Sequence, residues 1–265
     1  MNEEEWDKGA LLARQKMPIK GLKILPHMVG ITPETRKDLK WKSLKWIVQE
    51  DKEGLILKGF LRNPFKHLGR LLRSLLAPIP YNREGDLFFY GVSNEDAFKK
   101  ILGDPSTLLV LGFSYCHKPF ECPSGRFTED CSHNPKNDIC RQCFIGKAHH
   151  FLPPETVSLC IPTIHYIGNK IFALQKVNPK KKIIFIITAC EMTLTMFGDL
   201  GNMAGIRGIG IRLDGRICNT MKAFELSEKG VKPGLTVVLD KTQDKMLLLL
   251  KERSKQLQRA ENGAV

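Results

Sequence analysis

The chain has 265 residues, of which 42% are hydrophobic and 26% are charged, so it can bury a core without using its cysteines as staples. It has no stretch of 18 uncharged apolar residues, so we expect no membrane span. Its first residues include the acids Glu3, Glu4 and Glu5 and do not resemble a basic secretory leader, so we expect a cytoplasmic protein. The net charge of +13 predicts an anionic partner, namely nucleic acid, a membrane surface or a phosphorylated ligand, although a merely basic surface would give the same charge.

Residues 1–85 predict a basic, mainly helical N-terminal region. The first 31 residues carry scattered proline and glycine without a steady period, and we expect an irregular arm there. A helix begins at Thr32-Pro33-Glu34, where a capping hydroxyl precedes a proline and an acid, and it runs to about Glu50. The apolar side chains that we expect this helix to bury are Leu39, Leu44, Ile47 and Val48.

A second helix begins at Asn63-Pro64 and is stopped by Pro78 and Pro80. Its apolar residues recur at helical spacing, while its basic residues occupy the other face. The apolar set is Phe65, Leu68, Leu71, Leu72, Leu75 and Leu76, and the basic set is Lys66, Arg70 and Arg73. Such a helix can lie on an anionic membrane, which would make the protein peripheral there. The sequence favours instead a leucine face packed onto the next domain, because the helix is short and its neighbours look globular.

Residues 86–240 predict a cysteine-rich α/β domain with a mostly parallel open sheet and flanking helices. Strands are expected at 108–111, 157–161, 182–188 and 206–213. Helices are expected to end at Gly103, to span 165–177, and to run from Glu191 to about Leu200. Strands that alternate with helices are typical of βαβ units. Residues 241–265 predict a charged C-terminal helix and tail.

A cysteine-rich loop follows the first of these strands, at the carboxyl edge of the expected sheet. Five cysteines lie within 28 residues at the spacing C-x5-C-x8-C-x8-C-x2-C, namely Cys116, Cys122, Cys131, Cys140 and Cys143. In a reducing compartment, clustered cysteines are more often metal ligands or catalytic groups than disulfides. The polar stretch between the third and fourth cysteines needs something to order it, and metal binding supplies that free energy.

Two further cysteines follow other predicted strands. Cys190 comes directly after the strand at 182–188 and begins a helix, and Cys218 comes shortly after the strand at 206–213. Because parallel strands end at the same edge, we expect Cys116, Cys190 and Cys218 to meet there, where open α/β sheets place their ligands. The helix N-terminus should lower the pKa of the Cys190 thiol. Cys160 lies inside a strand and is interpreted as a core residue.

The seven cysteines other than Cys160 are therefore predicted to bind metal. The spacing lacks the second C-x-x-C pair of a zinc ribbon and does not fit the bacterial ferredoxin run. An iron–sulfur cluster is favoured because its ligand spacings are more tolerant, and zinc is the alternative. A mixed arrangement, with one metal in the loop and a reactive thiol at Cys190 or Cys218, remains open. The turn Ser124-Gly125-Arg126 is a candidate anion-binding site.

Three segments together resemble a known family. They are Cys140-Arg141-Gln142-Cys143-Phe144-Ile145-Gly146, Ala189-Cys190-Glu191 and Cys218-Asn219-Thr220. In this order, over roughly residues 105–230, they resemble the cysteine-rich prokaryotic family catalogued as domain of unknown function 116. The resemblance implies an α/β fold with a metal or iron–sulfur site, and it implies no reaction. The stretch from Cys131 to Cys140 looks like an insert relative to that family.

The leading functional hypothesis is a metal-binding protein, iron–sulfur in type, with a redox or enzymatic role. A zinc-stabilised nucleic-acid-binding module is the alternative, because the chain is basic and carries a cysteine loop. A thiol enzyme without metal, using Cys190 at a helix start, is a third hypothesis.

Overall fold

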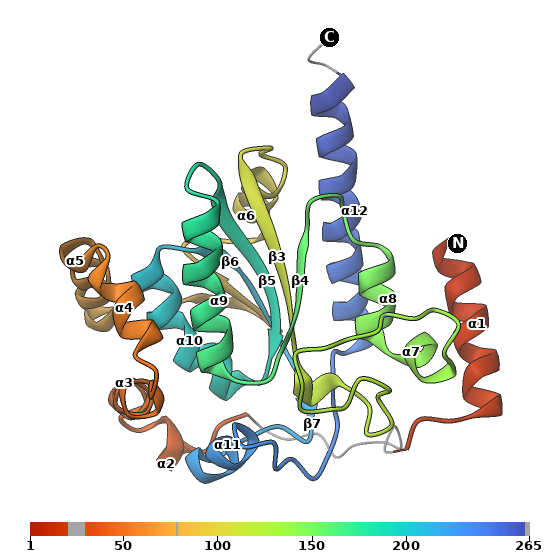
Figure 1. The fold of residues 1–265 in the computed structure, drawn as a ribbon, viewed down its shortest axis with the longest axis horizontal. Coiled ribbons are helices and arrows are strands. Elements are labelled where there is room, and N and C mark those ends of the chain that lie inside the picture. The colour runs from red at the N-terminus through yellow and green to blue at the C-terminus, as the bar shows by residue number, and fades with distance from the viewer. Residues whose placement is uncertain (21–29, 78, 263–265) are drawn as a thin grey trace.

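A six-stranded sheet forms the centre of the molecule in the computed structural model, which describes residues 1–20, 30–77 and 79–262 (Figure 1). The strand order is β1-β2-β6-β5-β3-β4. The parallel strands are β3 (Thr107–Ser114), β4 (Val157–Ile161), β5 (Lys182–Ala189) and β6 (Arg207–Arg212). A hairpin of β1 (Asn82–Glu84) and β2 (Leu87–Tyr90) adds two antiparallel strands beside β6. The predicted α/β class with a mostly parallel sheet is confirmed, and the hairpin was not foreseen.

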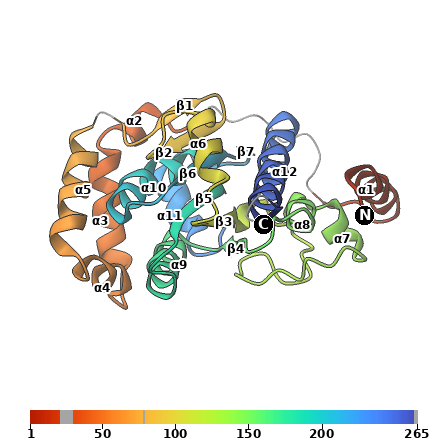
Figure 2. The same ribbon diagram turned by 90° about the horizontal axis from the view of Figure 1, so that it is seen from above.

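The central strands are buried on both faces, as their continuous apolar sequences predict. In β5, Ile184 and Ile186 point into one core, while Phe185 and Ile187 point into the other. Helices α9 (Ile164–Val177) and α10 (Glu191–Ala204) cover the second of these faces. The first face is covered by α6 (Glu95–Leu102), α8 (Phe144–His150) and α12 (Asp240–Asn262) (Figure 2).

The helices of the N-terminal region form an outer layer beyond α9 and α10 (Figure 2). They are α2 (Pro33–Arg36), α3 (Leu39–Glu50), α4 (Leu55–Leu61) and α5 (Pro64–Leu76). The single helix expected from residue 32 to 50 is broken between α2 and α3, where Asp38 adopts the left-handed conformation with φ 58°. Two of the four side chains expected to be buried are not, because Val48 is 75% exposed and Leu44 is half-buried.

Helix α5 is turned the opposite way from the favoured prediction. Its buried residues are the polar His67 and Ser74, and its apolar stripe lies at the surface. The helix does pack on α10, as expected, but only Leu71 and Leu75 of its predicted leucine face are partly buried there, and the other four apolar residues are exposed. It ends at Leu76, and Pro78, which was expected to stop it, lies outside the described residues.

The first residues are not an irregular arm. Helix α1 (Glu3–Lys16) begins with a capping box, in which Asn2 and Glu5 satisfy each other's backbone N–H groups. It packs on α7 (Asp138–Gln142), across the molecule from α3–α5 (Figure 1). The part of the expected arm at residues 21–29 lies outside the described residues.

The remaining short elements close the carboxyl edge of the sheet. A 3-10 turn covers Tyr115–His117, β7 (Asp214–Gly215) pairs with β8 (Thr236–Val237), and α11 is Met221–Ser227. Of the helices in the described part of the chain, none combines the length and apolarity needed to cross a bilayer.

Candidate metal and thiol sites

The structure arranges the seven predicted cysteines as two groups rather than one. The loop set, defined as Cys122, Cys131, Cys140 and Cys143, lines one small cavity. The edge set is Cys116, Cys190 and Cys218, whose thiols interact with one another at the carboxyl edge of the sheet. The cavity beside the edge set shares no lining residue with the cavity of the loop set. All eight cysteines of the chain are free thiols.

The loop set is carried mostly by irregular backbone. Residues 118–137 contain no helix or strand, and they supply Cys122 and Cys131. Helix α7 begins where the Asn137 side chain accepts hydrogen bonds from the N–H groups of Ile139 and Cys140. Cys143 lies at the junction of α7 and α8. Short helices therefore place two of the four sulfurs, and the loop places the other two.

Backbone N–H groups point at three of the four sulfurs of the loop set. The pairs, each given as donor and sulfur, are Ser124 with Cys122, His133 with Cys131, and both Ile145 and Gly146 with Cys143. Such bonds favour a thiolate over a thiol and orient a sulfur ligand. Burial is nevertheless the larger effect at two of these sulfurs, since it raises the pKa of Cys122 and raises that of Cys143 to about 12.

Cys160 is a fifth thiol beside the loop set. It is buried in β4, as the sequence predicts, and it interacts with Cys131. That interaction is the main cause that lowers the pKa of Cys131, and it raises the pKa of Cys160. The register of the sheet explains the meeting, because Cys160 pairs with Phe113 near the carboxyl end of β3, where the loop begins.

The lysine Lys118 is buried next to the loop set, with only 1% of its surface exposed. Its ammonium donates to the carbonyls of Thr128 and Asp130 at 3.2 and 2.6 Å, and it favours the thiolates of Cys122 and Cys160. It forms no ion pair with a carboxylate among the described residues. A buried ammonium without a carboxylate is costly, so negative charge at the cysteines would stabilise it.

The edge set is built by strand ends, as expected. Cys116 lies in the turn after β3, Cys190 is the N-cap residue of α10 after β5, and Cys218 follows β6 and β7. The three cysteines therefore lie at the carboxyl edge, as predicted, and Cys190 interacts with the thiols of both others. Each of the three side chains is buried.

A second buried lysine, Lys232, serves the edge set. Its Nζ lies 3.2 Å from Sγ of Cys218, and the side chain is 8% exposed. Burial opposes its charge, but the thiols of Cys116, Cys218 and Cys190 raise its pKa overall. In the described part of the chain it has no carboxylate partner, so a thiolate is the counter-charge that the structure offers it.

Charge at the edge set is concentrated on one sulfur. The neighbouring Cys218 thiol is the main cause that lowers the pKa of Cys190 to about 5, with help from Lys232 and from Thr193, whose Oγ1 lies 3.3 Å from Sγ of Cys190. The same pairing raises the pKa of Cys218. Burial raises the pKa of Glu228, which lines the adjoining cavity, to about 8. Burial also raises the pKa of Cys116. At neutral pH the edge set therefore offers one thiolate and two thiols, beside the protonated carboxyl group of Glu228.

The anion-binding role predicted for Arg126 is not supported. Its guanidinium donates to four backbone carbonyls, those of Cys116, Lys118, Lys232 and Gly234. It also stacks on the Phe120 ring, 4.0 Å from the centroid. Because its donors are directed at carbonyls of the loop and of the segment after α11, Arg126 holds these two segments together.

Sequence reasoning missed the two buried lysines and separated Cys160 from the site. Lys118 stands two residues after Cys116 in an apolar context, which was a usable signal. Lys232 lies in the polar segment between α11 and β8, where an exposed lysine is expected, and no local pattern identifies it. His133 also lines the loop-set cavity, and it stacks on His149 with ring centroids 3.4 Å apart.

Cysteine sulfur is a ligand type of zinc and iron–sulfur centres, but the four loop-set side chains are not gathered around a common point. Within residues 1–20, 30–77 and 79–262, no group of three or more His, Cys, Asp or Glu side chains has an arrangement that could hold a metal ion. The four thiols share one cavity, and backbone N–H groups are in place for three of them. Binding would therefore need the irregular segments to contract around the ion or cluster.

Comparison with known proteins found no match. No protein-family model matches the chain, and neither a curated protein nor a solved structure is significantly similar to it. The site must therefore be interpreted from its own chemistry.

Proposed function

We propose that this chain is a metal-binding protein with a redox or enzymatic role, and that its loop set holds the metal through four thiolates. The observation that carries the proposal is that four free thiols line one cavity and that backbone N–H groups are directed at three of the sulfurs. Four cysteines are a ligand set of both iron–sulfur clusters and structural zinc. We favour an iron–sulfur cluster, with zinc as the alternative, because the ligands come from a long loop rather than from two C-x-x-C turns.

The residues around the loop set would balance the charge of such a centre. Four thiolates bring more negative charge than a divalent ion neutralises. Lys118 supplies a buried positive charge beside Cys122 and Cys160. Since burial raises the pKa of Cys122 and Cys143, loading should release protons, and the metal would supply the free energy that keeps the thiolates ionised.

The edge set supports a reactive-thiol role next to that centre. Cys190 is activated without metal, by the Cys218 thiol, Lys232 and Thr193. It lines a cavity together with Thr163 and Glu228. A low-pKa thiolate in a cavity is the usual arrangement of a nucleophilic or redox cysteine. We therefore propose the mixed arrangement, with metal in the loop and thiol chemistry at the sheet edge.

The experiment is anaerobic purification followed by iron, sulfide and zinc analysis of the full chain. The wild type should carry iron with sulfide, or zinc alone if the alternative holds. The variant Cys140→Ser/Cys143→Ser should lose the metal, whereas the matched variant Cys190→Ser/Cys218→Ser, with the same number and type of changes, should keep it. Protein that is free of metal after anaerobic purification would overturn the proposal.

A zinc-stabilised nucleic-acid-binding module is the second candidate, and the net charge of +13 supports it. Affinity for RNA or DNA should then fall steeply as salt increases, because bound counterions are released. Filter binding across a salt series tests this function. Binding that is absent at low salt would eliminate it.

We further propose that the protein works in the cytoplasm. All eight cysteines are free, and a low-pKa thiol such as Cys190 persists best in a reducing compartment. A tagged form of the chain can be expressed in cells, which are lysed under acid quench, and its free thiols can be labelled at once. This labelling should find the cysteines reduced. A stable disulfide between any two of them in freshly lysed cells would contradict this location.

A further inference from the structure

Helix α5 is an amphipathic helix mounted with its apolar side outward. Phe65 is 90% exposed and Leu76 is 86% exposed, and Leu68 and Leu72 between them are exposed as well. At helical spacing these four residues form one stripe along the length of the helix, here called the α5 stripe. A surface helix normally buries such a stripe, so its exposure calls for a partner.

Polar contacts on the buried side fix the rotation of α5. Oγ of Ser74 donates to Oδ1 of the buried Asp199 at 2.7 Å and accepts from Nδ2 of Asn202 at 2.9 Å. Nδ1 of His67 lies 2.9 Å from the carbonyl oxygen of Phe60. Rolling the stripe inward would break these bonds and leave Asp199 buried without them, which is costly. The outward stripe is therefore a property of the folded chain.

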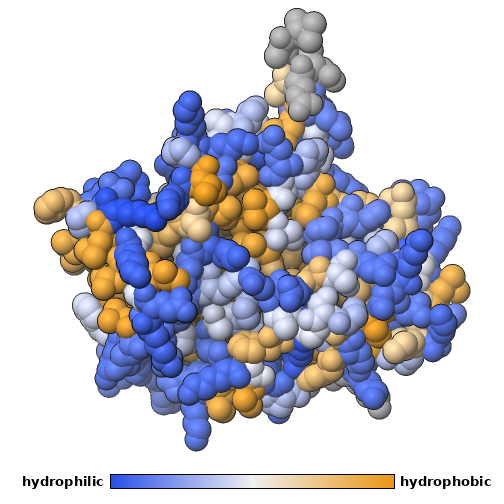
Figure 3. All heavy atoms as spheres, viewed as in Figure 1, coloured by the Kyte–Doolittle hydropathy of each residue, from blue (hydrophilic) through white to orange (hydrophobic). Residues whose placement is uncertain are grey.

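The charge around the α5 stripe has one sign. From Gly54 to Arg83 the sequence contains six Lys or Arg residues and no Asp or Glu. Lys66 and Arg73 are exposed along one flank of the stripe, and Lys58 and Arg62 are exposed on α4 and just after it. Figure 3 shows apolar surface over the α4–α5 region beside strongly hydrophilic side chains. An apolar stripe flanked only by cations matches an anionic surface with an apolar interior.

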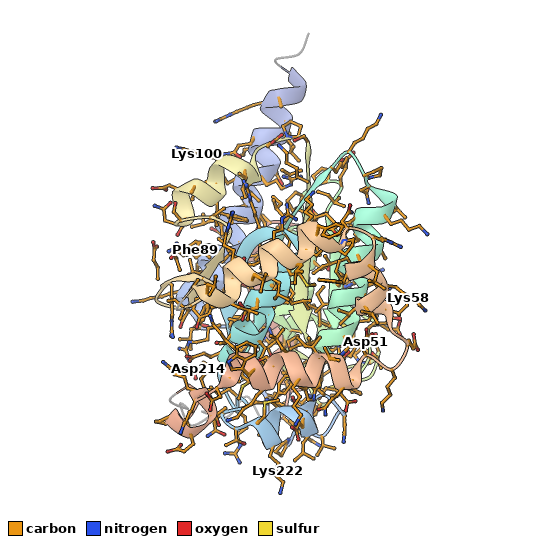
Figure 4. All side chains as sticks on the ribbon, turned by 90° about the vertical axis from the view of Figure 1, so that its left-hand side faces the viewer. Asp51, Lys58, Phe89, Lys100, Asp214 and Lys222 are labelled. Carbon is orange, nitrogen blue, oxygen red and sulfur yellow. The ribbon has the colours of Figure 1, made fainter. Side chains whose placement is uncertain are left out.

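Neighbouring helices extend the same surface. Leu57 and Leu61 of α4 are more than half exposed. Val48 of α3, Leu57 and the α5 residue Leu71 line an apolar groove of about 290 Å³. Figure 4 faces this layer and shows α5 above α3, both in front of the sheet, with Asp51 and Lys58 at one end. The acids Glu50, Asp51 and Glu53 lie there, at the α3–α4 connection, and α5 itself contains no acid, so the contact should be centred on α5.

We propose that the α5 stripe docks the protein on an anionic lipid bilayer, as a peripheral contact separate from the cysteine sites. The four stripe residues would enter the boundary between headgroups and acyl chains, while Lys66 and Arg73 meet lipid phosphates. Trp41 of α3, 66% exposed in the same layer, is a side chain suited to the headgroup region. Affinity would depend on both the apolar and the basic part, because either signal alone gives weak binding.

The test is sedimentation of the full chain with vesicles. Wild-type protein should pellet with vesicles of equal parts phosphatidylcholine and phosphatidylglycerol, and much less with phosphatidylcholine alone. The variant Phe65→Ser/Leu72→Ser/Leu76→Ser should lose at least tenfold in binding, at roughly 25 cal/mol for each Å² of apolar surface withdrawn from water. The variant Lys66→Glu/Arg73→Glu should lose at least tenfold, on the basis of about 1 kcal/mol for each basic residue at the surface.

Two controls keep the proposal open to refutation. The matched variant Leu226→Ser/Val231→Ser/Leu248→Ser replaces three exposed apolar residues on other elements and should bind vesicles like wild type. Circular dichroism should show that all variants are folded. Wild-type protein that stays in the supernatant, or a stripe variant that still pellets, overturns the proposal. A wild-type dimer that the stripe variant converts to a monomer, without vesicle binding, would assign the stripe to a second copy and overturn it too.

Discussion

The loop set and the edge set contain the same chemical group but are held in place by different means. Cys116, Cys190 and Cys218 sit at the ends of strands and at a helix start, so the hydrogen-bonded sheet fixes them. Cys122 and Cys131 sit in residues 118–137, which form no helix or strand. Each set also has its own buried lysine, Lys232 at the edge and Lys118 at the loop.

The difference separates a preorganised site from one that needs a ligand. At the edge set, Cys190 already has a lowered pKa from its neighbours. At the loop set, Cys131 also has a lowered pKa, owing to Cys160, but it lies in irregular backbone. Burial raises the pKa of Cys122 and Cys143, so these two thiols are protonated until a metal displaces the protons. Removing metal should therefore disturb the loop and leave the sheet edge in place.

The largest expected effect is that of metal removal. A chelator added to metal-loaded protein should make residues 118–137 sensitive to trypsin, while circular dichroism shows the α/β fold retained. Structural metal binding stabilises a small domain by roughly 10 kcal/mol, and here that free energy would act on the loop. Mass spectrometry of the fragments locates the cuts. Equal protease resistance with and without metal would remove the distinction between the two sets.

The next effect concerns the residue that ties the two regions together. Arg126→Met should destabilise the fold by about 2–4 kcal/mol, since the guanidinium bonds to four backbone carbonyls would be lost. Urea unfolding measures the change. Arg259→Met, at an exposed position of α12, is the control and should lie within about 0.5 kcal/mol of wild type. An equally stable Arg126 variant would mean that loop and edge are not coupled through this side chain.

A pH effect is expected at the edge set without metal. The folded pKa of Glu228 is about 8, well above its value in an unfolded chain, so its favourable contribution is complete below about pH 4.3 and is lost as pH rises to about 8. Glu228→Gln keeps the shape and removes the titration. Relative to this variant, wild-type stability should fall by roughly 4 kcal/mol between pH 4.5 and pH 8, at about 1.4 kcal/mol for each pKa unit.

Urea unfolding of both proteins, in the presence of chelator, checks this expectation at the two pH values. The variant and the wild type should differ more at the higher pH. A constant difference across the range would show that the Glu228 carboxyl is ionised at neutral pH, and the edge set would then lack its protonated group.

The smallest expected effect is on thiol reactivity. In Lys232→Met, the pKa governing Cys190 alkylation should rise by about one unit from its lowered value, because the nearby ammonium is gone. The rate of Cys190 alkylation by iodoacetamide is measured across pH for each protein and divided by its plateau at high pH. The midpoint then gives the pKa, whatever the accessibility of the thiol to the reagent. Lys229→Met, a change in an exposed part of the same segment, is the control. An unshifted profile would mean that Cys218 and Thr193 alone activate Cys190.

The strands could be predicted because their short apolar sequences fit a buried strand and neither a helix nor a surface segment. Ile183-Ile184-Phe185-Ile186-Ile187 is too short for a helix and too apolar for a surface, and it forms β5. Once the strands are parallel, Cys116, Cys190 and Cys218 must lie at one edge. The β1–β2 hairpin was missed because its strands are three and four residues long, and α1 because its capping box was not recognised.

The orientation of α5 could not be predicted from periodicity. The pattern identifies the apolar side of a helix, and it does not identify what that side meets. Ser74 is an ordinary polar residue until Asp199 and Asn202, more than a hundred positions later, supply its hydrogen-bond partners. The same holds for Lys232 and Cys218, whose contact depends on how the segment after α11 returns to the sheet.

The sequence by itself determined the α/β class and the order in which the parallel strands and their connecting helices follow one another along the chain. It also determined which residue types are available for metal and thiol chemistry. These properties depend on local apolar patterns and on composition. The tertiary structure decided the rest. It divided seven cysteines into two sets, assigned a buried lysine to each, directed Arg126 at backbone carbonyls and turned the apolar stripe of α5 to the surface. These outcomes depend on contacts between distant segments, which a local pattern does not encode.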